Sequence, residues 1–194
     1  MKLVEALCKF NRKERYWLIR HAIGNHHLRQ KIRNDLAEVL RIDPIPVVAY
    51  WAIDYHLDWV AGAISELREG HSKEVFEQTL TDTALVQGNQ EDIDLLIAFD
   101  NKIIMVEYKA GGKWGDQLGS KQARIDQLHS FAKSHAKTFN IEIRFAIVCP
   151  EKKKGDNTDW LVLDEYDDES FKRVERCDKD GKKKASGGFW RVKK

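Results

Sequence analysis

Residues 90–109 read QEDIDLLIAFDNKIIMVEYK, two apolar segments separated by Asp100-Asn101-Lys102. Ile, Leu, Val and Phe dominate both segments and favour strands, whereas the polar residues between them favour a turn. The pattern predicts an antiparallel hairpin. The acidic residues of this segment are then carried on strands.

Charged residues are expected to gather at one rim of this hairpin. Because side chains alternate across a strand, Glu107 and Lys109 share one face of the second strand. Asp92 and Asp94 are expected to share a face of the first, and Asp94 stands where polar loop passes into apolar strand, an unfavourable place for a charge that nothing binds. Two carboxylates suit a hard cation such as Mg²⁺, which leaves other positions to water and substrate phosphate. The lysine would stabilise negative charge on the phosphate or orient an attacking hydroxide.

The positions of Asp94, Glu107 and Lys109 resemble the PD-(D/E)xK nuclease superfamily, whose core hairpin carries an Asp and then Glu-x-Lys at comparable spacing. The resemblance covers residues 90–150, with Ile93 in place of the signature's proline. It implies a restriction-endonuclease-like core and a metal-dependent nuclease. In such a site Asp94 and Glu107 hold one or two Mg²⁺ ions, with Mn²⁺ as a substitute, and Lys109 is catalytic. The alternative interpretation is an ordinary buried hairpin that ends in a Glu–Lys salt bridge.

Composition bounds the class of protein. With 194 residues, 42% of them hydrophobic and 33% charged, the chain predicts one soluble domain with at most an appendage. The sequence holds no apolar run of about 18 residues, and Glu5 interrupts the first apolar residues too early for a signal peptide, so a cytoplasmic location without membrane contact is expected. Three scattered cysteines without a CxxC pair predict free thiols. No Walker, GxGxxG or GxSxG pattern supports an ATP, nicotinamide or serine-hydrolase function.

Short helices are expected in the first part of the chain. Residues 12–23 follow an approximate capping box, and the expected buried side consists of Trp17, Leu18 and Ile23. Residues 28–40 repeat apolar residues at helical spacing and stop before two prolines. Residues 72–80 predict a further short helix.

Residues 47–69 give the longest helical pattern, apolar and aromatic, and predict the central packing helix. Asp54 and Asp58 are spaced to lie along one stripe of this helix. The resembled superfamily often takes a further metal ligand from an upstream helix, so Asp58 or Asp54 is a second candidate, as is Asp92 on the hairpin. An exposed polar stripe is the alternative.

The segment that follows Lys109 is expected to contact the substrate. Trp114 lies in a glycine-containing connection, and loops in such positions usually carry specificity. The residues after it, to 137, predict a helix. Its N-terminal half carries Gln117, Lys121 and Arg124, where backbone N–H groups also favour phosphate, although simple solvation of these side chains is the alternative. The superfamily commonly places a glutamine or basic residue on this helix beside the active site, which implies that role for Gln117 and Lys121.

Two further strands are expected at residues 141–149 and 160–163. A hairpin, a helix and another buried strand make an α/β fold, an α/β/α sandwich with a mixed central sheet, the natural architecture. The expected organisation is a single globular unit with three parts: an N-terminal helical segment packed on the core (1–80), the nuclease-like core (81–170) and a basic C-terminal hairpin or tail (171–194).

The C-terminal end is strongly basic. Residues 172–194 contain ten Lys or Arg and three acids, a charge of +7, and because the whole chain carries +2 the rest carries −5. The basic loop Lys182-Lys183-Lys184 is a candidate contact for a polyanion, with a solvated loop as the alternative. The sequence thus predicts a nucleic-acid partner, with DNA favoured by analogy with the superfamily. A catalytically silent binding module, a subunit of a larger defence or mobile-element complex, and a homodimer remain open.

Overall fold

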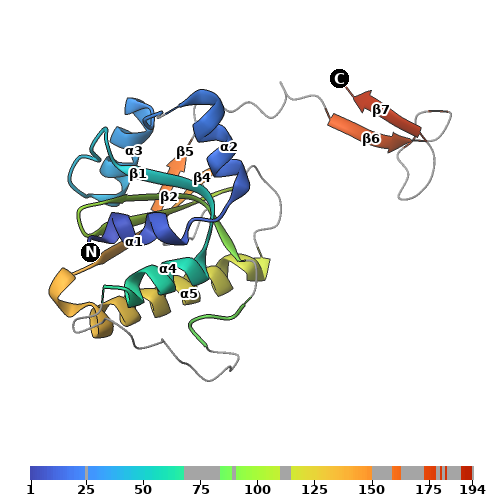
Figure 1. The fold of residues 1–194 in the computed structure, drawn as a ribbon. Coiled ribbons are helices and arrows are strands. Elements are labelled where there is room, and N and C mark those ends of the chain that lie inside the picture. Colours follow the sequence, from blue (N-terminus) through green and yellow to red (C-terminus); the bar gives the residue numbers. More distant parts are fainter. Residues whose placement is uncertain are drawn as a thin grey trace. The chain divides into compact units, whose positions relative to one another are not determined.

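One mixed, five-stranded sheet forms the centre of the first part of the chain in this computed structural model (Figure 1). The structure describes residues 1–24, 26–67, 84–88, 91–109, 115–149, 159–162, 173–177, 180, 182 and 189–193. These residues fall into two compact units, Met1–Val162 and Leu163–Lys194.

The strands of this sheet lie side by side in the order in which they occur in the chain: β1 (Tyr50–His56), β2 (Asp92–Phe99), β3 (Lys102–Tyr108), β4 (Glu142–Cys149) and β5 (Asp159–Val162). β1, β2 and β3 are antiparallel neighbours, whereas β4 runs parallel to β3 and β5 parallel to β4. The expected hairpin is therefore confirmed as β2 and β3, with its turn at Asp100 and Asn101.

Helices cover both faces of the sheet (Figure 1). On one face, α1 (Leu3–Phe10) contacts β2 and α4 (Leu57–Ser65), and α5 (Gly115–His135) contacts β4 and α4. On the other face, α3 (Gln30–Leu40) packs on β4 and β5. The remaining helices are α2 (Glu14–Ile23), between α1 and α3 in the chain, and the short η1 (Lys137–Phe139) after α5. The α/β class and the mixed sheet are confirmed.

β1 and β2 break their alternation at the same point. Ala52 and Tyr55 of β1 both belong to the main hydrophobic core, and so do their partners on β2, Leu96 and Ile93. Strict alternation would place residues three positions apart on opposite faces. The break falls at Asp54, whose φ of 49° lies in the left-handed region that Asp tolerates better than most residues. This irregularity turns the last residues of β1 and the first residues of β2 relative to the rest of each strand.

The prediction of one long helix over residues 47–69 is wrong. Residues 50–56 form β1, and the helix that follows, α4, begins at Leu57 and ends at Ser65. An apolar, aromatic run cannot be assigned to helix or strand by periodicity alone, and here the antiparallel ladder with β2 determines the outcome. Asp54 and Asp58 consequently lie on different elements and share no stripe.

Helix α2 forms near the expected position, but its buried side differs from the expectation. Trp17, Leu18 and Ile23 are 43%, 67% and 59% exposed, whereas Tyr16 is buried. The Tyr16 ring packs edge-to-face against Tyr50, with ring centroids 6.2 Å apart, so contact with β1 determines which side of the helix faces inward. Helix α1 has no counterpart among the expected elements.

The remaining elements follow the sequence expectations closely. The helices expected near residues 28–40 and after the glycine-containing connection are α3 and α5, and the strands at 141–149 and 160–163 are β4 and β5. The second unit holds the terminal hairpin, β6 (Arg173–Cys177) paired antiparallel with β7 (Phe189–Lys193). The short helix expected at 72–80 lies outside the described residues. Among the described helices, none has the length and apolar character that crossing a membrane requires.

Candidate functional site

Asp94 and Glu107 lie opposite each other at one end of the hairpin. The last pair of the ladder between β2 and β3 joins Leu95 to Val106, so the register places Asp94 across from Glu107. Asp94 Oδ2 accepts a hydrogen bond from the backbone N–H of Tyr108 at 2.6 Å. This bond holds the carboxylate of β2 at the end of β3.

Glu107 is the buried centre of this arrangement. Its side chain is only 4% exposed, and each carboxylate oxygen is bonded to a different lysine. Oε1 accepts from Lys109 Nζ at 2.7 Å, and Oε2 accepts from Lys121 Nζ at 2.6 Å. Lys121, which α5 supplies, also donates to the backbone oxygen of Asp92 at 2.8 Å. The structure thus brings Asp94, Glu107 and Lys109 together and adds Lys121 to them; we call these four residues the acid–lysine cluster.

The environment of Asp94 opposes its ionisation. Burial raises the pKa of the Asp94 carboxyl above its ordinary value, and the negative charge of Glu107 acts in the same direction. The Tyr108 N–H and the positive charges of Lys121 and Lys109 oppose this rise in part. A half-buried carboxylate of raised pKa, next to a second carboxylate, is a place where an added cation would relieve electrostatic repulsion.

The variant Asp94→Asn is expected to be more stable than the wild type at neutral pH in metal-free buffer. A folded-state pKa above the unfolded value means that the ionised carboxylate destabilises the fold, and this penalty is fully present above the folded pKa. Asn has a similar shape and keeps an oxygen to accept the Tyr108 N–H. The gain should shrink as pH falls through the folded pKa, because wild-type Asp94 then takes up a proton, and vanish below the ordinary carboxyl pKa. Urea unfolding across this pH range measures the difference.

The matched control for this prediction is Asp43→Asn. The Asp43 side chain is 80% exposed and pairs with Lys102 at 3.2 Å, so its replacement should change the unfolding free energy by less than about 0.5 kcal/mol at any of these pH values. Equal or lower stability of Asp94→Asn than of the wild type at neutral pH would contradict the role of burial at Asp94.

Asp92 belongs to a different group of contacts. Its Oδ2 accepts from Lys13 Nζ at 2.5 Å, and its Oδ1 lies 2.5 Å from His56 Nδ1. Asp92 and Asp94, which were expected to share a face, have different partners in the described contacts: Asp92 meets Lys13 and His56, whereas Asp94 accepts the Tyr108 N–H. Asp92 therefore ties the segment before α2 and the end of β1 to β2.

Asp58 and Arg124, which were expected to bind metal and substrate, form a buried ion pair with each other. Arg124, expected at the substrate, is 4% exposed and donates to Asp58 Oδ1 at 2.5 Å and to Glu91 Oε2 at 2.8 Å. Asp58, expected as a second metal ligand, also accepts the backbone N–H groups of Gln87 and Gly88. These contacts join α4, α5 and the segment before β2, so we assign them to the framework.

Several of the expected substrate contacts cannot be placed. Trp114, Lys183 and Lys184 lie outside the described residues, and the side chain of Gln117 in α5 lies outside them as well. Lys182 is exposed in the second unit. Of the expected set, Lys121 is the residue that the structure joins to Glu107.

Asp94 and Glu107 are the two residues of the acid–lysine cluster that could hold a hard cation. Asp94 Oδ2 accepts the Tyr108 N–H, and no described contact involves its Oδ1. Both oxygens of Glu107 are held by lysines, so Glu107 can bind a cation only if one ammonium group moves away. Within the described ranges, no three His, Cys, Asp or Glu side chains are grouped so as to hold a metal. Two carboxylates match a Mg²⁺ ion that takes its other ligands from water and phosphate.

Sequence reasoning missed the partners that come from distant parts of the chain. The pairing of Glu107 with Lys109 follows from alternation along one strand, but the second bond, to Lys121, depends on how α5 packs. The contacts of Lys13 and His56 with Asp92 could not be predicted, because the residues around them do not indicate that β1 is a strand beside Asp92.

Comparisons of the chain with protein-family models, with curated proteins and with solved structures found no match.

Proposed function

We propose that this protein is a metal-dependent nuclease that hydrolyses phosphodiester bonds, with DNA as the favoured substrate. The observation that carries the proposal is the acid–lysine cluster: Asp94 faces Glu107 across the hairpin, and Glu107 holds Lys109 and Lys121. The antiparallel hairpin, the crossover helix α5 and the parallel strand β4 further support the restriction-endonuclease-like core that the sequence resemblance implies.

Each residue of the cluster has a role in this proposal. Asp94 and Glu107 hold Mg²⁺, which when bound supplies a Lewis acid beside the phosphate and lowers the pKa of a bound water. Glu107 holds Lys109 and Lys121 in place through its short contacts with both ammonium groups. An ammonium group released from Glu107 is then available to the scissile phosphate, where it stabilises the negative charge that develops.

One feature favours a nucleic acid over a small phosphodiester, the charge of the C-terminal end. The +7 charge of residues 172–194 suits a polyanion, and phosphate contacts of this kind supply most of non-specific nucleic-acid binding. The preference for DNA over RNA rests on analogy with the resembled superfamily.

Cleavage assays with single-stranded, linear duplex, circular and branched DNA, and with RNA, test the proposal. We expect cleavage in Mg²⁺ or Mn²⁺, none in a chelator, and none in Ca²⁺. Asp94→Asn should remove cleavage while remaining folded, and Asp43→Asn should retain it. Cleavage by Asp94→Asn at the wild-type rate would refute the assignment of Asp94, and absence of cleavage of every substrate in every metal would refute the proposal.

A second candidate function is binding of nucleic acid without chemistry. The observation that favours it is that both oxygens of Glu107 already have lysine partners, an arrangement that also serves as a structural ion cluster. Calorimetry with Mn²⁺ separates the two functions: a heat of binding that disappears in Asp94→Asn supports the nuclease, whereas DNA binding without any metal binding supports the silent module.

A further inference from the structure

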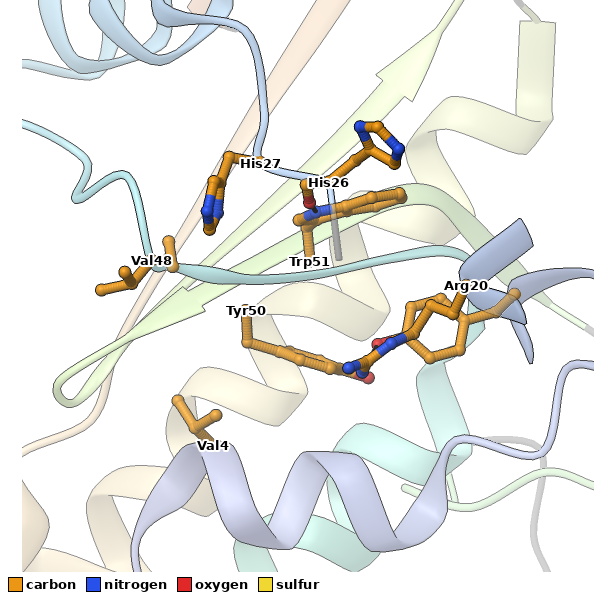
Figure 2. A pocket seen from close by; sticks show the side chains of 9 residues that line it. Val4, Arg20, His26, His27, Val48, Tyr50 and Trp51 are labelled. Atoms are coloured by element: carbon orange, nitrogen blue, oxygen red, sulfur yellow. Dashed lines mark hydrogen bonds between the residues drawn. The ribbon is translucent and has the colours of Figure 1, made fainter. Parts of the chain in front are cut away.

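A second concave site lies at the outer edge of β1, apart from the acid–lysine cluster. It has a volume of about 290 Å³ and is formed by α1, α2, the segment around His26 and His27, and residues 48–51 (Figure 2). β1 is the outermost strand in the order of the sheet, so this site lies where the sheet ends among the described strands. Its size suits a ligand of about one nucleotide.

The edge cavity has a basic wall. Arg20 supplies a positive charge, His26 and His27 add imidazole rings, and none of the described lining residues is an Asp or Glu. Arg20 projects from α2 toward the hydroxyl end of Tyr50, and His27 lies on the far side beside Val48 (Figure 2). A wall that combines a guanidinium with imidazoles and lacks carboxylates favours an anionic group.

Aromatic rings supply the rest of the wall. Tyr50 and Trp51 are half-buried neighbours on β1 whose rings lie on opposite sides of the strand (Figure 2). The Tyr16 ring meets both at steep angles, 64° and 83°, with centroids 6.2 Å away in each case. Both contacts of Tyr16 are edge-to-face, and Tyr50 and Trp51 each keep part of their surface exposed. Aromatic side chains stack on nucleobases with little dependence on sequence.

Bonds inside the wall hold these groups in place. Arg20 Nη1 donates to the Tyr16 hydroxyl at 2.8 Å, and Asn11 Nδ2 donates to the Tyr50 hydroxyl at 3.0 Å. Trp51 Nε1 donates to the backbone oxygen of His26 at 2.8 Å. Burial raises the pKa of Tyr50, so its hydroxyl remains neutral and does not repel an anion. A ligand would meet a wall that is already ordered.

The edge cavity and the acid–lysine cluster lie at opposite ends of β2. Tyr50 pairs with Ala98, four residues along β2 from Asp94, which corresponds to about 13 Å. A ligand in the cavity therefore cannot be the same group that Asp94 and Glu107 hold.

We propose that the edge cavity binds a nucleoside 5′-monophosphate unit that spans the edge of β1, with its phosphate against Arg20 near the Tyr50 hydroxyl and its base on the side of Trp51 and His27. The unit is either a free nucleotide or the phosphorylated end of a strand, because both present the same base and phosphate. The proposal goes beyond the proposed function, and its test needs neither metal nor cleavage.

Calorimetric titration of the full chain in a chelator tests this binding with thymidine 5′-monophosphate, thymidine and inorganic phosphate as separate probes. We expect the monophosphate to bind at least about tenfold more tightly than either part alone. Arg20→Gln should weaken it by about tenfold or more, and His27→Ala by about threefold, in line with a lost charged and a lost neutral hydrogen bond. His21→Ala, an exposed histidine on α2 outside the cavity wall, is the control and should bind like the wild type.

His27 is exposed, so His27→Ala keeps the test valid even if Arg20→Gln affects folding. Wild-type affinity in both variants would overturn the proposal, as would binding no tighter than about 1 mM. Binding that is lost in Asp94→Asn but kept in Arg20→Gln would overturn it too, because the nucleotide would then sit at the acid–lysine cluster. A thymidine oligonucleotide with and without a 5′-phosphate separates the two sources: a phosphate-dependent gain over the free nucleotide assigns the cavity to strand ends, and failure of the oligonucleotide to compete assigns it to free nucleotides.

Discussion

Metal-dependent cleavage should fall by at least about a hundredfold when Glu107 is replaced by Gln. Replacing a residue that only supports a metal ligand typically lowers metal affinity or activity by about 10- to 100-fold. The proposed role of Glu107 is that of a ligand itself, so a larger effect is expected. The amide keeps the size of the side chain but loses the charge that a hard cation requires. Cleavage rates at saturating Mg²⁺ measure this effect.

Loss of Glu107 also has a structural effect that must be separated from the chemical one. The carboxylate is the partner of Lys109 and Lys121, whose side chains are 26% and 12% exposed, so Glu107→Gln leaves two partly buried ammonium groups without it. Breaking a buried ion pair from one side typically destabilises by about 3–5 kcal/mol.

The double variant Glu107→Gln/Lys121→Met separates the two effects. Removing the less exposed ammonium group should restore much of the stability but none of the cleavage. Glu142→Gln, on the neighbouring strand β4 in a more exposed pair with Arg144, is the matched control and should change neither quantity appreciably. Recovery of cleavage in the double variant would mean that Glu107 acts only through the fold.

The second large effect is expected on stability, from Arg124→Met. Arg124 is buried and pairs with both Asp58 and Glu91, so the methionine fills similar space but leaves two carboxylates without their partner. An uncompensated buried charge typically costs about 3–5 kcal/mol of unfolding free energy. Urea unfolding monitored by circular dichroism measures the loss.

Two comparisons check this assignment of Arg124. Arg144→Met removes an arginine that is 46% exposed from its pair with Glu142, and should cost less than about 1 kcal/mol. If Arg124 instead contacts substrate, as the sequence predicted, Arg124→Met should keep its stability and lose substrate affinity, which a binding titration at low temperature would reveal.

The elements that could be predicted from the sequence are those determined by neighbouring residues. The β2–β3 hairpin is one, because both strands and the turn at Asp100 lie in one segment, and the shared face of Glu107 and Lys109 follows from alternation alone. Helix α5 is another, since its apolar residues recur over a long stretch.

The elements that were missed depend on distant partners. The apolar pattern of residues 50–56 is compatible with a helix, but these residues form strand β1 because they pair with β2. The break in the alternation of β1 at the left-handed residue Asp54 is also something that a period-two pattern cannot anticipate. Likewise, the sequence around Arg124 indicates an exposed residue of α5, because its partners Asp58 and Glu91 lie far away in the chain.

The position of β1 at the edge of the sheet has a consequence for the order in which the molecule folds. The acid–lysine cluster uses residues from 94 to 121, a hairpin and the helix after it, so its loop-closure entropy is small. Strand β1 must find partners much further along the chain, from His56 with Asp92 to Tyr50 with Ala98, and separations of this kind slow folding. We therefore expect the amides of β2 and β3 to gain protection from pulsed hydrogen exchange before those of β1, so that the edge cavity is completed after the carboxylates are already in place.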